Sequence, residues 1–219
     1  YIIELAKGTL SEEKIKDIGL PCSPELLERA RLSSEATLRA CLSACEEQVA
    51  FNLAGGAHHA FRDRGSGFCF LNDIAIAALE LLKKKQIKKI SIIDCDVHQG
   101  DGTASIMLNE SRVFTFSIHA KDNFPFIKGK SDLDIALANK STDDEYLNKL
   151  EKGLYLPINL FAPDLVIYLA GADPYEGDRL GKLSITKSGL MKRDEIVFNV
   201  CNKFNIPICV TMAGGYGRN

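Results

Sequence analysis

Short runs of consecutive apolar residues constrain the fold of this chain more than any other feature. Each run is five or six residues long, and segments with helical periodicity separate the runs. Strands that are apolar on both faces are typical of parallel sheets covered by helices, and alternation with helices indicates βαβ units. The sequence therefore predicts an α/β fold with a mostly parallel central sheet. The predicted strands, each expected to be covered on both faces, are 49–53, 90–94, 113–117, 165–170 and 208–212.

The segments between the strands give the predicted helices and one long loop. Segment 121–142 is rich in Pro, Gly, Asp, Lys and Ser, so we expect a surface loop there. Before about residue 31 the helical pattern is weak, with a cap at Ser11 and breaks at Pro21 and Pro24. No repeat or linker divides the chain, which predicts one domain. The predicted helices are 34–47, 71–84, 102–109, 144–161 and 186–205.

Charge and cysteine usage exclude several kinds of partner. With 27 basic and 29 acidic side chains, the chain has no basic excess for direct binding of nucleic acid or of an anionic membrane. It lacks an apolar run of the roughly 18 residues that a membrane helix needs, and it opens on no signal sequence. The seven cysteines form no CxxC pair, which predicts reduced thiols and a cytoplasmic location, or a nuclear one in a eukaryote. The sequence does not predict an oligomeric state.

Polar and titratable residues collect where the predicted strands end. Ligands of an open parallel sheet bind beyond the carboxyl ends of its strands, because the loops diverge there. All four histidines lie in these segments. The segments are 54–60, 94–102, 117–119, 171–178 and 214–217.

One of these segments has the spacing of a metal site. Asp94, Asp96 and His98 alternate along an extended stretch, which places their side chains on one face. Buried carboxylates this close repel one another unless a cation lies among them. With Asp173 from another strand end, Asp and His ligands would hold a metal and leave one position open, as in catalytic zinc sites. For the spacing alone, a solvated acidic turn is the alternative.

Two further segments carry groups that can move protons or bind an oxyanion. His58 and His59 follow a pair of glycines, and a neutral imidazole near a metal-activated water is a natural general base. Tyr216 also follows two glycines, and its phenol can stabilise a developing oxyanion. The alternatives are surface histidines without a role and an aromatic residue that covers the sheet edge.

Taken in order, these residues resemble the zinc-dependent histone deacetylases of the arginase/deacetylase superfamily. The resemblance runs from about Pro21 to the last residue, and Gln99 with segment 173–178 is most similar to the class IV branch and its bacterial relatives. It implies a three-layer αβα sandwich and a single deacetylase catalytic domain over residues 1–219. Because the chain starts at Tyr1 and stops soon after Tyr216, we expect it to lack N- and C-terminal portions of the domain. The motifs are Gly55-Gly56-x-His58-His59, Gly67-Phe68-Cys69-x-x-Asn72-Asp73, Asp94-x-Asp96-x-His98-x-Gly100-Asp101-Gly102, Ser117-x-His119, Gly171-Ala172-Asp173 and Gly214-Gly215-Tyr216.

The resemblance also implies residue roles, although it leaves open which histidine is the base and which the acid. The implied catalytic roles are zinc binding by Asp96, His98 and Asp173, proton transfer by His58 and His59, pairing of Asp94 with His58 and of Asp101 with His59, and carbonyl binding by Tyr216. The implied substrate tunnel is lined by Gly67, Phe68 and Leu180, with Phe124 as the opposing ring. The implied potassium site uses main-chain oxygens of Asp94, Asp96 and His98 together with Ser117 and Ile118. His119 has either a structural hydrogen bond or a role in the site.

The function implied is that of a zinc-dependent amidohydrolase, which removes the acyl group from N-acyl-lysine in a protein or peptide. One alternative is hydrolysis of small acylated amines such as acetylpolyamines. Another alternative is a non-catalytic scaffold that binds acyl-lysine. Such a scaffold would require the loss of a general base, a metal ligand or an oxyanion donor, and this sequence retains all three. The acyl length, the physiological substrate and the metal used in vivo, including iron(II) or cobalt, stay open.

Overall fold

Parallel strands form a single sheet at the centre of the computed structural model. Over residues 1–85 and 87–217, which the structure describes, the sheet has six strands in the order β1–β6–β5–β2–β3–β4. Every neighbouring pair is parallel, so the predicted parallel sheet is confirmed. The strands are β1 (Val49–Asn52), β2 (Ile90–Asp94), β3 (Val113–Ala120), β4 (Leu133–Leu137), β5 (Leu165–Leu169) and β6 (Ile208–Thr211).

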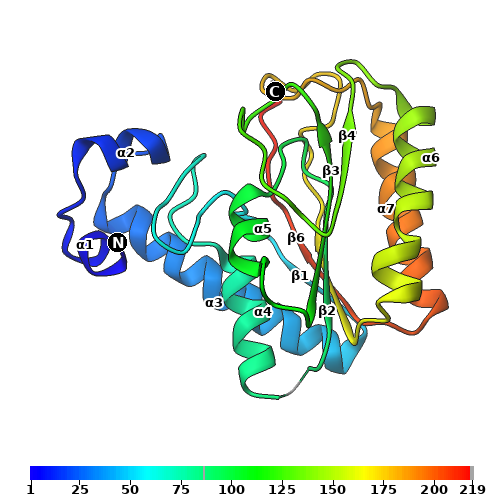
Figure 1. Cartoon of the computed structure of the whole chain (residues 1–219), viewed down its shortest axis with the longest axis horizontal. Helices are drawn as coiled ribbons and strands as arrows, with labels where there is room; N and C mark the ends of the chain where they lie inside the picture. The colour runs from blue at the N-terminus through cyan, green and yellow to red at the C-terminus, as the bar shows by residue number, and fades with distance from the viewer. Residues whose placement is uncertain (86, 218–219) are drawn as a thin grey trace.

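Helices cover both faces of this sheet and complete the predicted three-layer sandwich (Figure 1). One face packs against α3, α4 and α5, and the other against α6, α7 and the π-helix η1. The short helices α1 and α2 pack on the N-terminal part of α3 in a separate small cluster. In the described part of the chain, no helix is long and apolar enough to cross a membrane. The helices are α1 (Ile2–Lys7), α2 (Glu12–Ile18), α3 (Pro24–Glu47), α4 (Asp73–Lys83), α5 (Asp101–Met107), α6 (Asp143–Gly153), η1 (Tyr155–Leu160) and α7 (Lys187–Lys203).

Burial along the strands follows their place in the sheet. Every residue of the central strands β2 and β5 is buried, as their continuous apolar sequences predict. At the sheet edge, β1 leaves Val49 41% exposed and Phe51 55% exposed. The prediction that every strand is covered on both faces is therefore wrong for β1.

The predicted loop 121–142 is also wrong in part, because it contains β4. This strand pairs with β3 from Phe116–Leu133 to Ala120–Leu137. It carries Asp134, whose carboxylate accepts a hydrogen bond from Gln99 Nε2 at 2.7 Å. An edge strand with a charged residue and only one strand partner lacks the apolar run by which the other strands were predicted.

Prolines account for two other differences. Pro24 begins α3 instead of breaking a helix, because the first turn of a helix needs no N–H at that position, and Ser23 Oγ accepts a bond from Leu26 N at 3.3 Å. The predicted helix 144–161 ends as an α-helix at Gly153 and continues as η1. Pro157 lies inside η1, where its missing N–H cannot make the α-helical bond.

The strand order creates a crevice between β2 and β5. After β2 the chain continues to β3 on one side, and after β5 it continues to β6 on the other. Because these connections leave in opposite directions, the loops beyond β2 and β5 separate above the sheet. Residues that follow these two strands are therefore placed to surround a ligand.

Leu150→Ala should lower the free energy of unfolding by about 2–5 kcal/mol, because it leaves a cavity in the core under α6. Leu150 is 0% exposed, whereas Leu160 of η1 is 62% exposed. Urea unfolding of both alanine variants measures the difference. An equal loss in Leu160→Ala would contradict the assignment of α6 to the core layer.

Candidate active site

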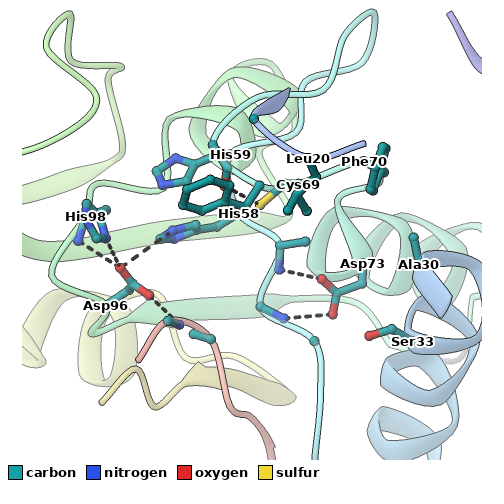
Figure 2. A pocket seen from close by; sticks show the side chains of 18 of the residues that line it. Leu20, Ala30, Ser33, His58, His59, Cys69, Phe70, Asp73, Asp96 and His98 are labelled. Carbon is teal, nitrogen blue, oxygen red and sulfur yellow. Dashed lines mark hydrogen bonds and ion pairs between the residues drawn. The ribbon is translucent and has the colours of Figure 1, made fainter. Parts of the chain in front are cut away.

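A cluster of three metal-ligating side chains lies at the crevice. Asp96 and His98 follow β2 and Asp173 follows β5; their ligand atoms all lie within 4.8 Å of one another, and all three residues are buried. His98 Nδ1 is 3.0 Å from Asp96 Oδ1 and 3.1 Å from Asp173 Oδ2 (Figure 2 shows His98 and Asp96). The structure thus brings together the three residues predicted to bind metal.

Backbone N–H groups hold the two ligand carboxylates in place. Asp96 Oδ2 accepts a bond from Gly214 N at 2.7 Å, and Asp173 Oδ1 accepts one from Val97 N at 2.8 Å. His98 N donates to Asp96 Oδ1 at 2.8 Å. These bonds fix the direction of each carboxylate, so the ligand set is preformed by the chain itself.

The electrostatics of this cluster favour a bound cation. Burial, reinforced by the charge of Asp96, raises the pKa of Asp173 to about 7. Burial opposes the charge on His98, but Asp173 and Asp96 outweigh it and raise its pKa to about 9. A divalent cation can replace the protons that these groups hold, and a donor set of two carboxylates and one imidazole suits zinc. The residues present therefore fit a catalytic metal.

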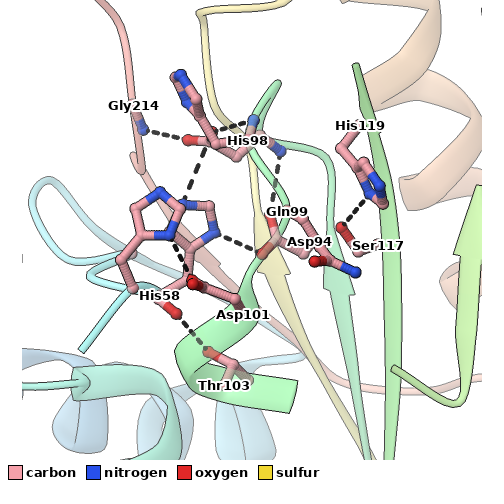
Figure 3. Close-up of polar contacts among 12 residues, drawn as sticks. His58, Asp94, His98, Gln99, Asp101, Thr103, Ser117, His119 and Gly214 are labelled. Atoms are coloured by element: carbon pink, nitrogen blue, oxygen red, sulfur yellow. Dashed lines mark hydrogen bonds and ion pairs between the residues drawn. The ribbon is translucent and has the colours of Figure 1, made fainter. Parts of the chain in front are cut away.

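Two carboxylate-bound histidines lie beside the cluster. His58 Nδ1 is 2.6 Å from Asp94 Oδ2, and His59 Nδ1 is 2.7 Å from Asp101 Oδ1 (Figure 3). The two ring centroids are 4.1 Å apart, and His58 Nε2 lies 3.7 Å from Asp96 Oδ1. A carboxylate on Nδ1 fixes the orientation of each ring and leaves Nε2 available for proton exchange.

The two histidines differ in charge. For His58, burial opposes protonation, but the carboxylates of Asp94 and Asp96 outweigh it and raise the pKa to about 10. Burial and the positive charge of His58 lower the pKa of His59 to about 4, against the influence of Asp101. In the metal-free site, this pair therefore offers one imidazole that favours the neutral form and one that favours the protonated form.

Asp73 holds the loop that carries the histidine pair, a role that the sequence did not reveal. Its carboxylate accepts bonds from Gly56 N at 3.1 Å, Ala57 N at 2.7 Å and Thr37 Oγ1 at 2.5 Å (Figure 2). Gly56 has φ +87°, and a Cβ there would lie 2.5 Å from Ala213 Cα, so only glycine fits. The detectable signals were its place in the first turn of a predicted helix and at the end of the motif that begins at Gly67.

A cavity of about 1250 Å³ connects these groups to the surface. The four predicted tunnel residues, Gly67, Phe68, Phe124 and Leu180, all line it. The Phe124 ring packs edge-on against His59 with centroids 4.8 Å apart, and Phe68 and Leu180 are 48% and 42% exposed at the mouth. The cavity is also lined by side chains from the α2–α3 region and the segment before α4. These lining residues include Leu20, Ala30, Ser33 and Phe70 (Figure 2).

Tyr216 closes one side of the cavity. Its ring centroid lies 6.3 Å from that of His98 and 6.2 Å from that of Phe68. Burial and the charge of Asp96 raise the pKa of Tyr216, so its phenol keeps its proton at neutral pH. Two residues to which the sequence analysis gave no role hold its backbone: Asp178 Oδ2 accepts from Tyr216 N at 2.5 Å, and Arg179 Nε donates to Tyr216 O at 2.8 Å.

The residues predicted for a potassium site lie on or beside β2 and β3. Asp94 of β2 pairs in register with Ser117 of β3, and Ile118 is the residue after Ser117.

The expectation that all four histidines lie beyond strand ends is wrong for His119, because β3 extends to Ala120. His119 Nδ1 lies 3.0 Å from Ser117 Oγ, which gives this histidine a structural hydrogen bond (Figure 3).

A buried Asp-His-Asp cluster beside a histidine pair, at the crevice of a parallel sheet, defines an α/β protein with a candidate metal site. The Histone deacetylase domain family matches residues 2–219, and the chain belongs to this family.

Similar proteins agree with this assignment. The chain is 42% identical over 219 residues to an uncharacterized protein of Picosynechococcus, covering 100% of this chain and 73% of that protein. It is 36% identical over 186 residues to Histone deacetylase 2 of Arabidopsis thaliana, covering 84% of this chain and 48% of that protein. The crystal structure of an HDAC homolog from Aquifex aeolicus superposes with a TM-score of 0.86 at 29% identity, covering 99% of this chain and 63% of that one. The chain thus spans less than two thirds of the latter two proteins.

Zinc should raise the midpoint of thermal unfolding of the metal-free chain. A ligand that binds only the folded state stabilises it by about 2.7 kcal/mol at a hundredfold excess over its Kd. Asp173→Asn removes an anionic ligand and should abolish most of this shift, whereas Asp144→Asn, at an exposed position on α6, should leave it unchanged. Calorimetry with and without zinc measures both. Equal zinc-induced shifts in the two variants would exclude Asp173 as a ligand.

Proposed function

We propose that this protein hydrolyses the amide bond of N-acyl-lysine in a protein or peptide, with zinc held by Asp96, His98 and Asp173. The observation that carries the proposal is that Asp96 and His98 line one cavity with two carboxylate-bound histidines and a tyrosine. Asp173 completes the ligand cluster with Asp96 and His98. Membership of the histone deacetylase family supports the same chemistry.

The chain supplies proton transfer and oxyanion binding to this reaction. Bound zinc would polarise the substrate carbonyl and lower the pKa of water. The carboxylate-bound imidazoles of His58 and His59 accept a proton from the attacking water and return one to the leaving amine. The Tyr216 phenol donates a hydrogen bond to the oxygen on which negative charge develops. All these groups are at least partly shielded from bulk solvent, which strengthens their electrostatic effect.

The cavity favours a long, apolar substrate stem. Phe68 and Phe124 line its outer part, and an apolar slot of this kind suits the methylene chain of lysine. Because the chain carries a net charge of only −2, we infer that the substrate is recognised through this slot and the metal more than through a charged surface.

We also propose that potassium binds main-chain oxygens at the ends of β2 and β3, with Ser117 and Ile118 among its ligands. The register of Asp94 with Ser117 supports this placement. Such a cation would stabilise the backbone that carries Asp96 and His98.

Tyr216→Phe should lower kcat by about 10²–10³-fold, the usual effect of removing one oxyanion donor, with little change in the Kd of an acyl-lysine peptide. Steady-state kinetics and calorimetric binding to the zinc-loaded protein measure the two quantities. Tyr155→Phe, at a residue that is 55% exposed in η1, is the matched control and should behave as wild type. Equal losses of turnover and binding would contradict the oxyanion role.

A series of acyl groups on one lysine peptide tests the reaction itself. Chelation should abolish turnover and added zinc should restore it, because the proposed chemistry depends on the metal. The part of the cavity that Leu20 and Ala30 line is expected to decide how long an acyl group is accepted. Acetylpolyamine assayed in parallel tests the small-amine alternative, which faster turnover of that substrate would support. A zinc-loaded protein inactive on every substrate would refute the proposed function and leave an acyl-lysine-binding scaffold.

A further inference from the structure

Arg193 is a charged residue on the buried side of α7. It is 2% exposed and, with Val197 and Cys201, falls at the i, i+4, i+8 spacing of the helix face that packs on the sheet. Burial of a charge costs several kcal/mol unless close partners compensate it. An apolar residue would satisfy the packing at this position, so packing alone does not explain why an arginine is buried there.

The guanidinium contacts one carboxylate and two backbone carbonyls. Asp194 Oδ1 lies 2.9 Å from Arg193 Nε and 2.8 Å from Nη2, which balances the charge, and it also accepts a bond from Tyr168 Oη at 2.6 Å. The remaining nitrogen, Nη1, donates to Gly171 O at 2.5 Å and approaches Cys95 O at 3.5 Å. Arg193 thus links α7 to the segments that follow β2 and β5.

These two carbonyls belong to the segments that carry the metal ligands. Cys95 immediately precedes Asp96, and Gly171 lies two residues before Asp173. The β2–β5 register ends at Asp94 and Leu169, so both carbonyls lie beyond the paired part of the strands.

The segments also pack too closely for a side chain to separate them. A Cβ on Gly171 would lie 2.9 Å from Asp96 Cα. A small rotation of either peptide unit would therefore change the separation of the Asp96 and Asp173 carboxylates.

We propose that Arg193 is a positioning residue for the metal site, which sets the distance between Asp96 and Asp173 by holding the Cys95 and Gly171 carbonyls together. A planar guanidinium has several donors in fixed directions, and a lysine ammonium cannot reproduce that geometry. The inference rests on the metal site proposed above, but it concerns metal affinity and does not depend on which substrate is hydrolysed.

Metal affinity without substrate is the decisive measurement. The test compares two variants. Arg193→Met keeps an unbranched side chain but removes its donors, and Arg193→Lys keeps the charge. Tyr168→Phe is the control, because it removes the bond to Asp194 and leaves the carbonyl contacts of Arg193 intact. Zinc Kd values from competition with a chromophoric chelator, and the visible spectrum of the cobalt(II)-substituted protein, are recorded beside the unfolding midpoint of the metal-free protein.

Arg193→Met is expected to weaken zinc binding 10–100-fold, the usual effect of losing a group that orients metal ligands, and to alter the cobalt spectrum. Arg193→Lys should lose about 3–10-fold if one carbonyl contact survives, and it keeps the test open should the methionine variant fail to fold. Tyr168→Phe should lower the unfolding midpoint without changing affinity or spectrum.

Wild-type affinity and an unchanged cobalt spectrum in a folded Arg193 variant would overturn the inference and leave the proposed deacylase activity untouched. An equal loss of affinity in Tyr168→Phe would also overturn it, because the effect would then follow stability alone. A wild-type chain that binds zinc but hydrolyses no acyl-lysine would refute the activity and not the positioning role. A wild-type chain that binds no zinc would refute both.

Discussion

Negative charge buried at one end of the sheet is the constraint on which the rest of this structure depends. Four aspartates, Asp94, Asp96, Asp101 and Asp173, are each at most 6% exposed there. Unpaired burial of even one would cost several kcal/mol. Three imidazoles lie among them, so carboxylates outnumber the groups that can carry a compensating proton. A divalent cation would reduce this imbalance, so the same charge that destabilises the metal-free fold would favour binding of a metal.

The fold concentrates this charge without losing its packing because the carboxylates lie outside the two cores. The apolar residues of β2 and β5 are covered on both faces, and the buried acidic residues begin at Asp94, the last residue of β2. Backbone N–H groups of Val97 and Gly214 then provide the hydrogen bonds that water would supply at a surface. Rigid strands and fixed amides together orient the ligand atoms, so little reorganisation is needed when a cation binds.

Much of this arrangement could be predicted from local sequence. The run 90–94 matches β2 at both ends, because a buried parallel strand is apolar on both faces. The alternation of Asp94, Asp96 and His98 then predicted a shared face. Asp173, 75 residues from His98, could be added only by the rule that ligands gather beyond strand ends. Their detailed roles came from the family resemblance.

What local sequence could not show depends on partners distant in the chain. β4 is a strand because β3 pairs with it, although its own residues are partly charged. Arg193 stands in the segment Lys192-Arg193-Asp194-Glu195, which is typical of a solvated helix face, yet its carbonyl partners lie 22 and 98 residues away. Helical spacing relative to Val197 was the one signal that this arginine faces inward. A charged residue on the apolar stripe of a helix that covers a parallel sheet therefore points to the strand ends as the place to look for its partners. Beyond those ends, backbone carbonyls no longer accept hydrogen bonds from a neighbouring strand and require other donors.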